Sequence, residues 1–145
     1  VPGRPLVIGG VSIPFHLGLL GHSDADVLLH AITDALLGAA SLGDIGTHFP
    51  DTDGRWKNAD SWHLLEMTGH SLAANGWQIV NIDCTVMAQA PKILPYKLKM
   101  QERISSALQI SPGIVNVKAK TAEKLGPVGL GHSIEARAIA LIHQA

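Results

Sequence analysis

The sequence predicts a single α+β domain in which one mixed β-sheet is covered by helices on one face. Segments with strand-like alternation and segments with apolar residues at helical spacing follow one another in the order β, α, α, β, α, β, β. This order is typical of domains in which helices pack against a sheet of parallel and antiparallel strands. A chain of 145 residues is long enough to form one hydrophobic core.

The first element is a strand over residues 4–13. Its apolar residues run between Pro5 and Pro14, and such punctuation commonly bounds a strand. Gly9 and Gly10 lie in the middle of the segment, and glycine inside a strand marks a bend or a bulge. We therefore expect one strand with an irregularity at these two residues.

The first helix is predicted over residues 21–38. Ser23 is a favourable N-cap, Asp26 stands three residues later as in a capping box, and Gly38 can end the helix. A broad apolar face predicts that most of this helix is buried. This face consists of Val27, Leu28, Ala31, Ile32, Ala35 and Leu36.

A narrow polar stripe remains on the same helix. Asp26, His30 and Asp34 follow one another at intervals of four residues, with Thr33 beside them. They can be ordinary side-chain pairs at the solvent edge of a core helix. Alternatively, His30 is a metal ligand whose second ring nitrogen is oriented by a carboxylate. The pattern alone leaves both interpretations open.

The middle of the chain predicts a loop, a helix and a strand. Residues 39–61 form a long loop rich in Gly, Asp and Pro, and loops of this length are often functional. A second helix begins at Asp60 or Ser61 and ends before Gly76. Residues 77–88 then alternate as a strand, and their inward face consists of Ile82, Cys84 and Val86.

The last part of the chain predicts one helix and two strands. The third helix is expected to bury Leu98, Met100, Ile104 and Leu108. Residues 114–122 alternate cleanly as a strand, with Lys118 and Lys120 on its polar face. The last strand carries Ala136, Ala138 and Ala140 on one face, where small side chains would let sheets approach closely around a symmetry axis.

Composition excludes several classes of function. The net charge of −1, with no basic run, gives no electrostatic support for nucleic-acid binding. No apolar stretch reaches transmembrane length, so no membrane partner is expected. Cys84 is the single cysteine, so zinc would be held by His and Asp, and a reducing cytoplasm is the expected location. Only 16% of residues are charged, which favours an oligomer that buries part of its surface.

Three loop positions are candidates for substrate contact. His22 stands at the start of the first helix, where free N–H groups attract a phosphate, although a surface histidine is the commoner case. Asp44, followed by Ile45 and Gly46, can hold a sugar-like hydroxyl group or simply cap a turn. Lys92 lies in a proline-bounded loop that can contact a nucleobase or merely connect a strand to a helix.

Four segments resemble one enzyme family nearly word for word. They are HSDADVLLHAITDALLGAASLGDIG, FPDTD, AQAPK and NVKAKTAEKLG. In this order they are similar to the 2-C-methyl-D-erythritol 2,4-cyclodiphosphate synthase family of the non-mevalonate isoprenoid route. The resemblance implies a lyase that converts a CDP-linked methylerythritol 2-phosphate into a cyclic diphosphate and CMP. It also implies a homotrimer whose sheets pack around a threefold axis, with active sites between subunits.

The resemblance assigns roles to individual residues of this sequence. His30 is implied as a zinc ligand and Glu123 as a ligand of magnesium or manganese. His22 and Ser23 are implied as phosphate contacts, and Thr121, with His22, as a catalytic residue. Residues 120–123 would come from the adjacent subunit. The implied substrate-binding residues are Asp44, Ile45, Gly46, Phe49, Pro50, Asp51, Thr52 and Asp53 for the methylerythritol part, Ala88, Gln89, Ala90, Pro91, Lys92, Ile93 and Leu94 for the cytidine, and Lys120, Thr121, Ala122 and Glu123.

Some positions depart from the family pattern. The family completes its zinc site with an Asp-x-His pair on a first strand, and this sequence begins after the place expected for that strand. Either those ligands precede Val1 in the full protein, which the intact later motifs favour, or the site is incomplete. Pro127 and Leu130 replace an aromatic residue and an arginine that face the family's trimer channel, which argues against a diphosphate ligand there. Lys120 replaces a smaller hydroxyl residue.

Two other functions compete with the synthase. One is a non-catalytic, truncated trimer that binds CDP or phosphate and has an incomplete zinc site. The other is a metal-dependent phosphohydrolase that uses His22, Asp24, Asp26 and His30. The products separate them, because a synthase releases CMP, a hydrolase releases inorganic phosphate, and a binding module turns nothing over.

Overall fold

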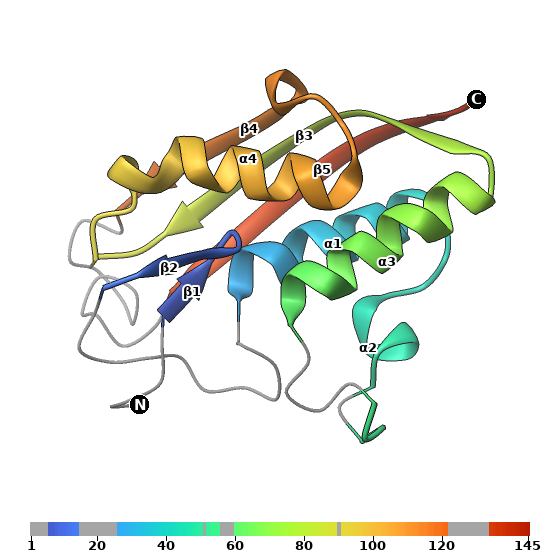
Figure 1. Cartoon of the computed structure of the whole chain (residues 1–145), viewed down its shortest axis with the longest axis horizontal. Helices are drawn as coiled ribbons and strands as arrows, with labels where there is room; N and C mark the ends of the chain where they lie inside the picture. Colours follow the sequence, from blue (N-terminus) through green and yellow to red (C-terminus); the bar gives the residue numbers. More distant parts are fainter. Residues whose placement is uncertain (1–5, 15–25, 51, 56–59, 90, 122–133) are drawn as a thin grey trace.

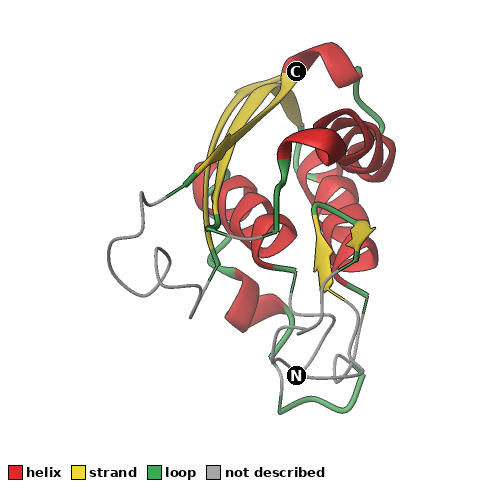
Figure 2. Ribbon diagram, turned by 90° about the vertical axis from the view of Figure 1, so that its left-hand side faces the viewer, coloured by secondary structure: helices red, strands yellow, loops and turns green. Residues whose placement is uncertain are grey.

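The computed structural model describes residues 6–14, 26–50, 52–55, 60–89, 91–121 and 134–145. Its helices lie on one face of a three-stranded sheet, as Figures 1 and 2 show. The sheet has the order β4-β3-β5, where β3 is Trp77–Met87, β4 is Val115–Lys120 and β5 is Glu135–Gln144. The β3 strand pairs in parallel with β4 and antiparallel with β5. The prediction of a mixed sheet covered on one face is confirmed for the described residues.

The N-terminal segment is a hairpin and not the single strand predicted from the sequence. Strands β1 (Leu6–Ile8) and β2 (Val11–Ile13) pair antiparallel as a separate sheet. Gly9 and Gly10 form the turn, with φ angles of 62° and 75°. Two successive residues with positive φ are the requirement of the tightest hairpin turns, so the glycine pair reverses the chain instead of bending it.

Helix α1 (Val27–Ala39) begins at a different cap from the one predicted. Asp26, not Ser23, is the N-cap, because its carboxylate accepts the backbone N–H of Leu29. The helix also continues one residue beyond Gly38, and Ala40 is its C-cap. Leu28, Leu29, Ile32 and Leu36 are fully buried.

The predicted loop at residues 39–61 contains the short helix α2 (Ile45–His48). Helix α3 (Ser61–Ala74) follows with Asp60 as its N-cap and Asn75 as its C-cap, close to the predicted bounds. The remaining helix is α4 (Lys97–Leu108). It lies between two single turns of 3-10 helix, η1 (Leu94–Tyr96) and η2 (Pro112–Ile114).

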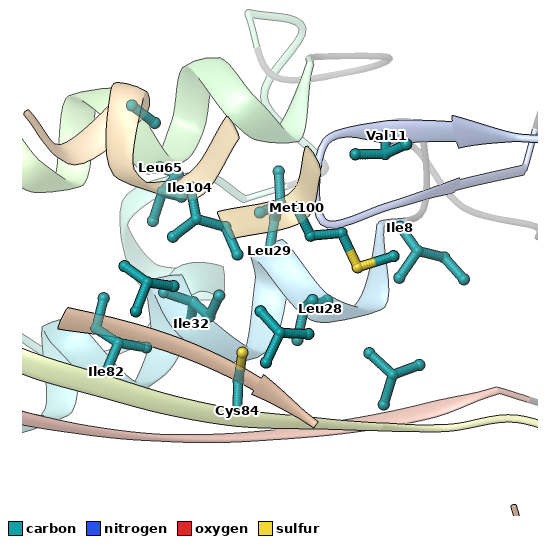
Figure 3. Close-up of a cluster of buried hydrophobic side chains, with 14 of the residues drawn as sticks. Ile8, Val11, Leu28, Leu29, Ile32, Leu65, Ile82, Cys84, Met100 and Ile104 are labelled. Atoms are coloured by element: carbon teal, nitrogen blue, oxygen red, sulfur yellow. The ribbon is translucent and has the colours of Figure 1, made fainter. Parts of the chain in front are cut away.

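Helix α4 buries three of the four apolar residues expected to face inward. Met100, Ile104 and Leu108 are buried, whereas the side chain of Leu98 is 75% exposed. Residues at intervals of four share one helix face, and Leu98 is two positions from Met100, on the opposite side. Figure 3 shows Met100 and Ile104 meeting Leu28, Leu29 and Ile32 of α1 in the core.

The alanines of β5 face the helices, which corrects another prediction. Ala136, Ala138 and Ala140 are partly buried against the core, where α1 packs on β5. Their small side chains therefore let a helix, and not a second sheet, approach closely. The opposite face of the sheet carries the larger side chains of β5, Ile139 and Leu141, which are 74% and 57% exposed.

Candidate active site

Two cavities open at the same end of the sheet. The first, called here the α1 cavity, has a volume of about 470 Å³ and lies between α1, α2 and the start of β5. The second, called the loop cavity, has a volume of about 170 Å³ and lies between the segment after β3 and the end of β4. Met87 pairs with Lys120 of β4 on one side and with Glu135 of β5 on the other. Neighbouring strands lie about 4.8 Å apart, so Lys120 of the loop cavity and Glu135 of the α1 cavity are separated by two strand spacings, about 10 Å.

The α1 cavity contains the candidate zinc ligand. His30 lines it together with Asp34, Ile45 and Glu135. The remaining described lining residues are Val27, Ala31, Ile134 and Ala136. His30 is half-buried, and its ring Nε2 lies 2.9 Å from Oγ of Ser61, the first residue of α3. The partner described for this nitrogen is thus a hydroxyl group, where one interpretation of the sequence expected a carboxylate.

The polar stripe of α1 reaches three different segments. Asp26 is wholly buried, and it accepts the N–H groups of Gly9, Gly10 and Leu29 at 2.9, 2.8 and 3.0 Å. His30 contacts α3, and Asp34 accepts the N–H of Ile45 at 3.0 Å. The stripe therefore connects the hairpin, α3 and α2 to α1, and the simple picture of pairs at a wet edge is wrong for Asp26.

Asp44 acts as a helix cap beside the α1 cavity. Its Oδ1 accepts the backbone N–H of Thr47 at 2.8 Å and the hydroxyl of Thr47 at 2.7 Å. These two hydrogen bonds hold the pKa of Asp44 below its ordinary value. The capped turn weighed from the sequence is therefore present, and the ionised carboxylate remains next to a cavity-lining residue, Ile45.

The residues after α2 are arranged around a surface ion pair. The Asp53 carboxylate accepts hydrogen bonds from the Arg55 guanidinium, the shortest being 2.8 Å, and these lower the pKa of Asp53. Phe49 is the C-cap of α2, and Pro50 and Thr52 follow it. The described lining residues of the two cavities do not include the predicted substrate contacts Gly46, Phe49, Pro50, Thr52 and Asp53.

The loop cavity joins two segments that are far apart in the sequence. Ala88 donates its N–H to the carbonyl of Lys120 at 3.0 Å, which fixes the start of one segment against the end of the other. The described lining residues include two lysines, Lys92 and Lys120, and no acid, so the cavity favours an anion. The other lining residues are Ala88, Gln89, Pro91, Ile93, Leu94, Ala119 and Thr121.

Six of the predicted site residues lie outside the described part of the chain. They are His22, Ser23, Asp51, Ala90, Ala122 and Glu123. Asp24, Pro127 and Leu130 lie outside it as well.

Comparison with known proteins decides the family. The chain matches the YgbB family over residues 1–143. It is 61% identical over 142 residues to a 2-C-methyl-D-erythritol 2,4-cyclodiphosphate synthase from Nitrosospira multiformis, covering 98% of this chain and 80% of that protein. The chain belongs to the 2-C-methyl-D-erythritol 2,4-cyclodiphosphate synthase family.

Other relatives of this synthase family carry a second enzyme in the same polypeptide. A bifunctional enzyme IspD/IspF from Albidiferax ferrireducens is 64% identical over 144 residues, which are 99% of this chain and 34% of that enzyme. The structure of the bifunctional IspDF from Campylobacter jejuni superposes with a TM-score of 0.95 at 43% identity, over 100% of this chain and 39% of that one. The chain thus spans only 34% and 39% of the length of these two bifunctional relatives.

The fold of the synthase family also matches over nearly whole proteins. A 2C-methyl-D-erythritol-2,4-cyclodiphosphate synthase described as the CDP-bound form has a TM-score of 0.88 at 35% identity, over 99% of this chain and 93% of that one. The chain therefore belongs to a family of enzymes that are lyases.

The donor chemistry of the α1 cavity fits part of the zinc site that the synthase family implies. Among the described residues there is no group of three or more His, Cys, Asp or Glu side chains that could hold a metal ion. His30 nevertheless lines an open cavity, and its Nε2 has the second hydrogen-bonding partner that metal-ligating histidines usually have. Cys84 does not fit, because burial raises the pKa of its thiol to about 12 and the side chain faces the core.

Several residues of the site are not predicted by the sequence pattern. Ser61 was expected only as the start of a helix, and nothing in the local pattern connects it with His30, 31 positions earlier. Ala119, Ile134 and Glu135 were missed as cavity residues. The register of β3 with β4 and β5 brings them there, and strand order is not readable from one sequence. The part of the chain that the structure describes holds no helix of the length and hydrophobicity that a membrane span needs.

Proposed function

We propose that the protein catalyses the metal-dependent cyclisation of 4-CDP-2-C-methyl-D-erythritol 2-phosphate to 2-C-methyl-D-erythritol 2,4-cyclodiphosphate, with release of CMP. The observation that carries this proposal is the pair of cavities at one end of the sheet. The lining of one includes the imidazole of His30 with two carboxylate residues, and the lining of the other includes two lysines. A substrate with a nucleotide at one end and a sugar phosphate at the other needs two such compartments, which in the trimer proposed below come from neighbouring subunits. The family membership supports the same assignment.

The loop cavity would hold the cytidine half of the substrate. Ala88 and Gln89, with the segment that follows them, offer backbone groups to the base, and Lys92 places a positive charge near the nucleotide phosphates. Thr121 lies at the end of β4 in the same cavity, where its hydroxyl can donate to a phosphate oxygen. A solved relative is described as a CDP-bound form, which supports a CDP-linked substrate.

The chemistry needs no general base in the protein. An oxygen of the 2-phosphate, ionised at neutral pH, attacks the β-phosphorus; the new P–O bond forms as the bond from the β-phosphorus to the bridging oxygen breaks, and CMP leaves with that oxygen. The barrier comes from bringing two anions together, and alignment in a closed site can supply about 7–11 kcal/mol of it. Zinc at His30, with magnesium or manganese at Glu123, would supply Lewis-acid stabilisation of the charge on the phosphoryl oxygens when bound.

The active unit in this proposal is a homotrimer with sites between subunits. In one chain the face of the sheet away from the helices leaves Val80, Ile139 and Leu141 exposed. A sheet face with large apolar side chains is the surface that a second copy would cover. Packing of three such faces around an axis would bring the loop cavity of one subunit towards the α1 cavity of the next.

Product analysis of the full-length protein tests the proposal. Incubated with the CDP-linked substrate, zinc and magnesium, the wild type should form CMP and the cyclic diphosphate in equal amounts, measured by ³¹P NMR and chromatography. His30→Ala should lose CMP release together with about one zinc per subunit, and His70→Ala, which changes an exposed histidine of α3, should keep both.

The alternatives give different products. Inorganic phosphate instead of the cyclic product would indicate a phosphohydrolase, and CDP binding without turnover would indicate a non-catalytic module. Full activity and zinc content in His30→Ala would contradict the assignment. Lys92→Met should raise KM for the substrate with little change in kcat, since Lys92 is proposed to contact the nucleotide and not the reacting atoms.

A further inference from the structure

We propose that Ser61 is the positioning residue for His30. It holds the imidazole with its proton on Nε2, so that the lone pair of Nδ1 is directed to the metal. This inference rests on the proposed zinc-binding role of His30 and adds a residue for which neither the sequence motifs nor the family comparison gives a role.

The contact itself has the geometry of a strong hydrogen bond. Ser61 Oγ and His30 Nε2 are 2.9 Å apart, and the serine is only 1% exposed. A neutral imidazole has one N–H donor and one acceptor nitrogen, and a serine hydroxyl can take either role opposite it. In this proposal Ser61 is the acceptor, which places the ring proton on Nε2 and leaves Nδ1 deprotonated. A ligating histidine needs this state, because a metal binds the lone pair of the ring nitrogen.

The position of Ser61 is fixed by its neighbour in the chain. The indole Nε1 of Trp62 donates to the carbonyl of Arg103 on α4 at 2.8 Å, and the Arg103 guanidinium lies 4.8 Å from the centre of the indole ring. Arg103 Nε in turn donates to the carbonyl of Gly10 at 3.2 Å. The first turn of α3 is therefore held against α4 and the hairpin.

The same series of contacts leads back to His30 through the hairpin and Asp26. The N–H groups of Gly9 and Gly10 bind the Asp26 carboxylate, and the backbone N–H of His30 donates to the Asp26 carbonyl at 3.0 Å. The chain of contacts thus runs from His30 through Ser61, Trp62, Arg103, Gly10 and Asp26 back to His30, and is called here the His30 circuit. It includes the hairpin, α1, α3 and α4, which meet in this region (Figure 1). Both the backbone and the ring of His30 are fixed by it.

Zinc affinity measured without substrate tests the proposal. Loss of a hydrogen bond to a metal-ligating histidine typically weakens metal binding by about 10–100-fold. In competition with a chromophoric chelator, Ser61→Ala should show a loss in this range, and Ser61→Thr, which keeps a hydroxyl group, should recover most of it. Ser105→Ala is the matched control, because Ser105 is also buried on a helix but donates to the carbonyl of Glu102. It should bind zinc as tightly as the wild type.

The tautomer of His30 gives a second readout that does not depend on turnover. Long-range ¹H–¹⁵N NMR of the zinc-loaded wild type should show the proton on Nε2 of His30 and the metal on Nδ1. In the same protein after chelation, the wild type should keep the Nε2–H tautomer and Ser61→Ala should show a mixture. A wild-type ring protonated on Nδ1, or zinc affinity in Ser61→Ala equal to that of Ser105→Ala, would overturn the proposal.

These experiments distinguish the positioning role of Ser61 from the metal-binding role of His30. If His30→Ala loses zinc while Ser61→Ala keeps full affinity, the positioning role is wrong and the proposed function stands. If His30→Ala keeps its zinc, the assignment of the metal site itself is wrong. Should Ser61→Ala be too unstable to purify, the tautomer of the wild-type ring still decides whether Ser61 accepts from Nε2.

Discussion

Single residues connect segments that are far apart in this chain, and Asp26 is the clearest example. Its carboxylate caps α1 and also accepts both N–H groups of the hairpin turn. A wholly buried carboxylate is costly unless it is fully hydrogen-bonded. Asp26 meets this condition with backbone groups that would themselves be buried without it. The residue thus fixes where α1 begins and where the hairpin lies.

We expect Asp26→Ala to lower the free energy of unfolding by about 3 kcal/mol, because three N–H groups lose a charged acceptor, one of them at a helix cap. Asp26→Asn should cost about half as much, since one oxygen can still accept from Gly9 and Leu29. Urea denaturation followed by circular dichroism measures both. Asp60→Ala is the control, and loss of this exposed cap should cost only about 1 kcal/mol. Equal effects of the two alanine variants would contradict the role given to Asp26.

A second prediction at the residue scale concerns Asp83 on the uncovered face of the sheet. Lys118 and Asn116 donate to its carboxylate at 2.8 and 3.1 Å, and these hydrogen bonds lower its pKa. An unfolded aspartate has a pKa of about 3.9, so as the pH falls the unfolded chain takes up the proton first. The stabilisation is therefore complete above that value and is lost as the pH falls through the lower pKa of the folded state.

Replacement of Asp83 by asparagine should remove this part of the acid sensitivity. Between about pH 5 and pH 2 the free energy of unfolding of Asp83→Asn should decrease less steeply than that of the wild type. Urea titrations at several pH values give the two slopes. Lys118→Met should flatten the profile in the same direction, and parallel curves for all three proteins would show that the interaction has no effect on stability.

At the scale of secondary-structure elements, the hairpin turn is packed tightly against helix α4. A Cβ added to Gly9 would lie 2.7 Å from Cγ of Met100, and the residue has a φ of +62°. Gly76 has a similar φ of +80° but nothing within 4 Å of an added Cβ. The two positions therefore separate backbone strain from crowding.

Gly76→Ala should lower stability by about 1 kcal/mol through backbone strain alone. Gly9→Ala should cost about 2–4 kcal/mol, since overpacking against α4 is added to that strain. Thermal unfolding of the two variants under the same conditions measures the difference. If both substitutions cost the same, Met100 moves aside freely and the turn is not tightly packed.

The elements themselves could largely be predicted from the sequence, whereas their partners could not. The bounds of α3 followed from Asp60 and from Asn75 and Gly76, because capping is a local effect. The two glycines of the hairpin gave an ambiguous signal, since bulges and reversals use the same residue. The alanine face of β5 was assigned to the wrong partner because periodicity identifies a face but not what covers it. Ser61 reached His30 only through the packing of α1 on α3.

At the scale of the whole molecule, the uncovered sheet face determines the proposed assembly. Burial of a fully exposed isoleucine contributes about 1.5–3 kcal/mol, and Ile139 is 74% exposed in the single chain. A charge at this position would have to be buried without a partner in a trimer, but would be solvated in a monomer. The face is therefore sensitive to one substitution that the isolated domain should tolerate.

We expect Ile139→Lys to shift the protein from the proposed trimer to a monomer in sedimentation velocity, with an unchanged circular dichroism spectrum. Activity should fall with the trimer, because the proposed site takes residues from two subunits. Leu98→Lys is the control, since Leu98 is 75% exposed on α4, away from this face. A trimer that survives Ile139→Lys would place the subunit interface elsewhere.

The pairing of the first long helix with the last strand has a consequence for synthesis of the protein. Helix α1 packs on β5, although about a hundred residues separate Val27–Ala39 from Glu135–Gln144, and Figure 1 shows the two side by side. Contacts this distant in sequence form late, because a long loop must close first. On the ribosome, the segment that carries His30 reaches its final surroundings only after the C-terminal strand has emerged. Until then the side of that segment that packs on β5 stays uncovered.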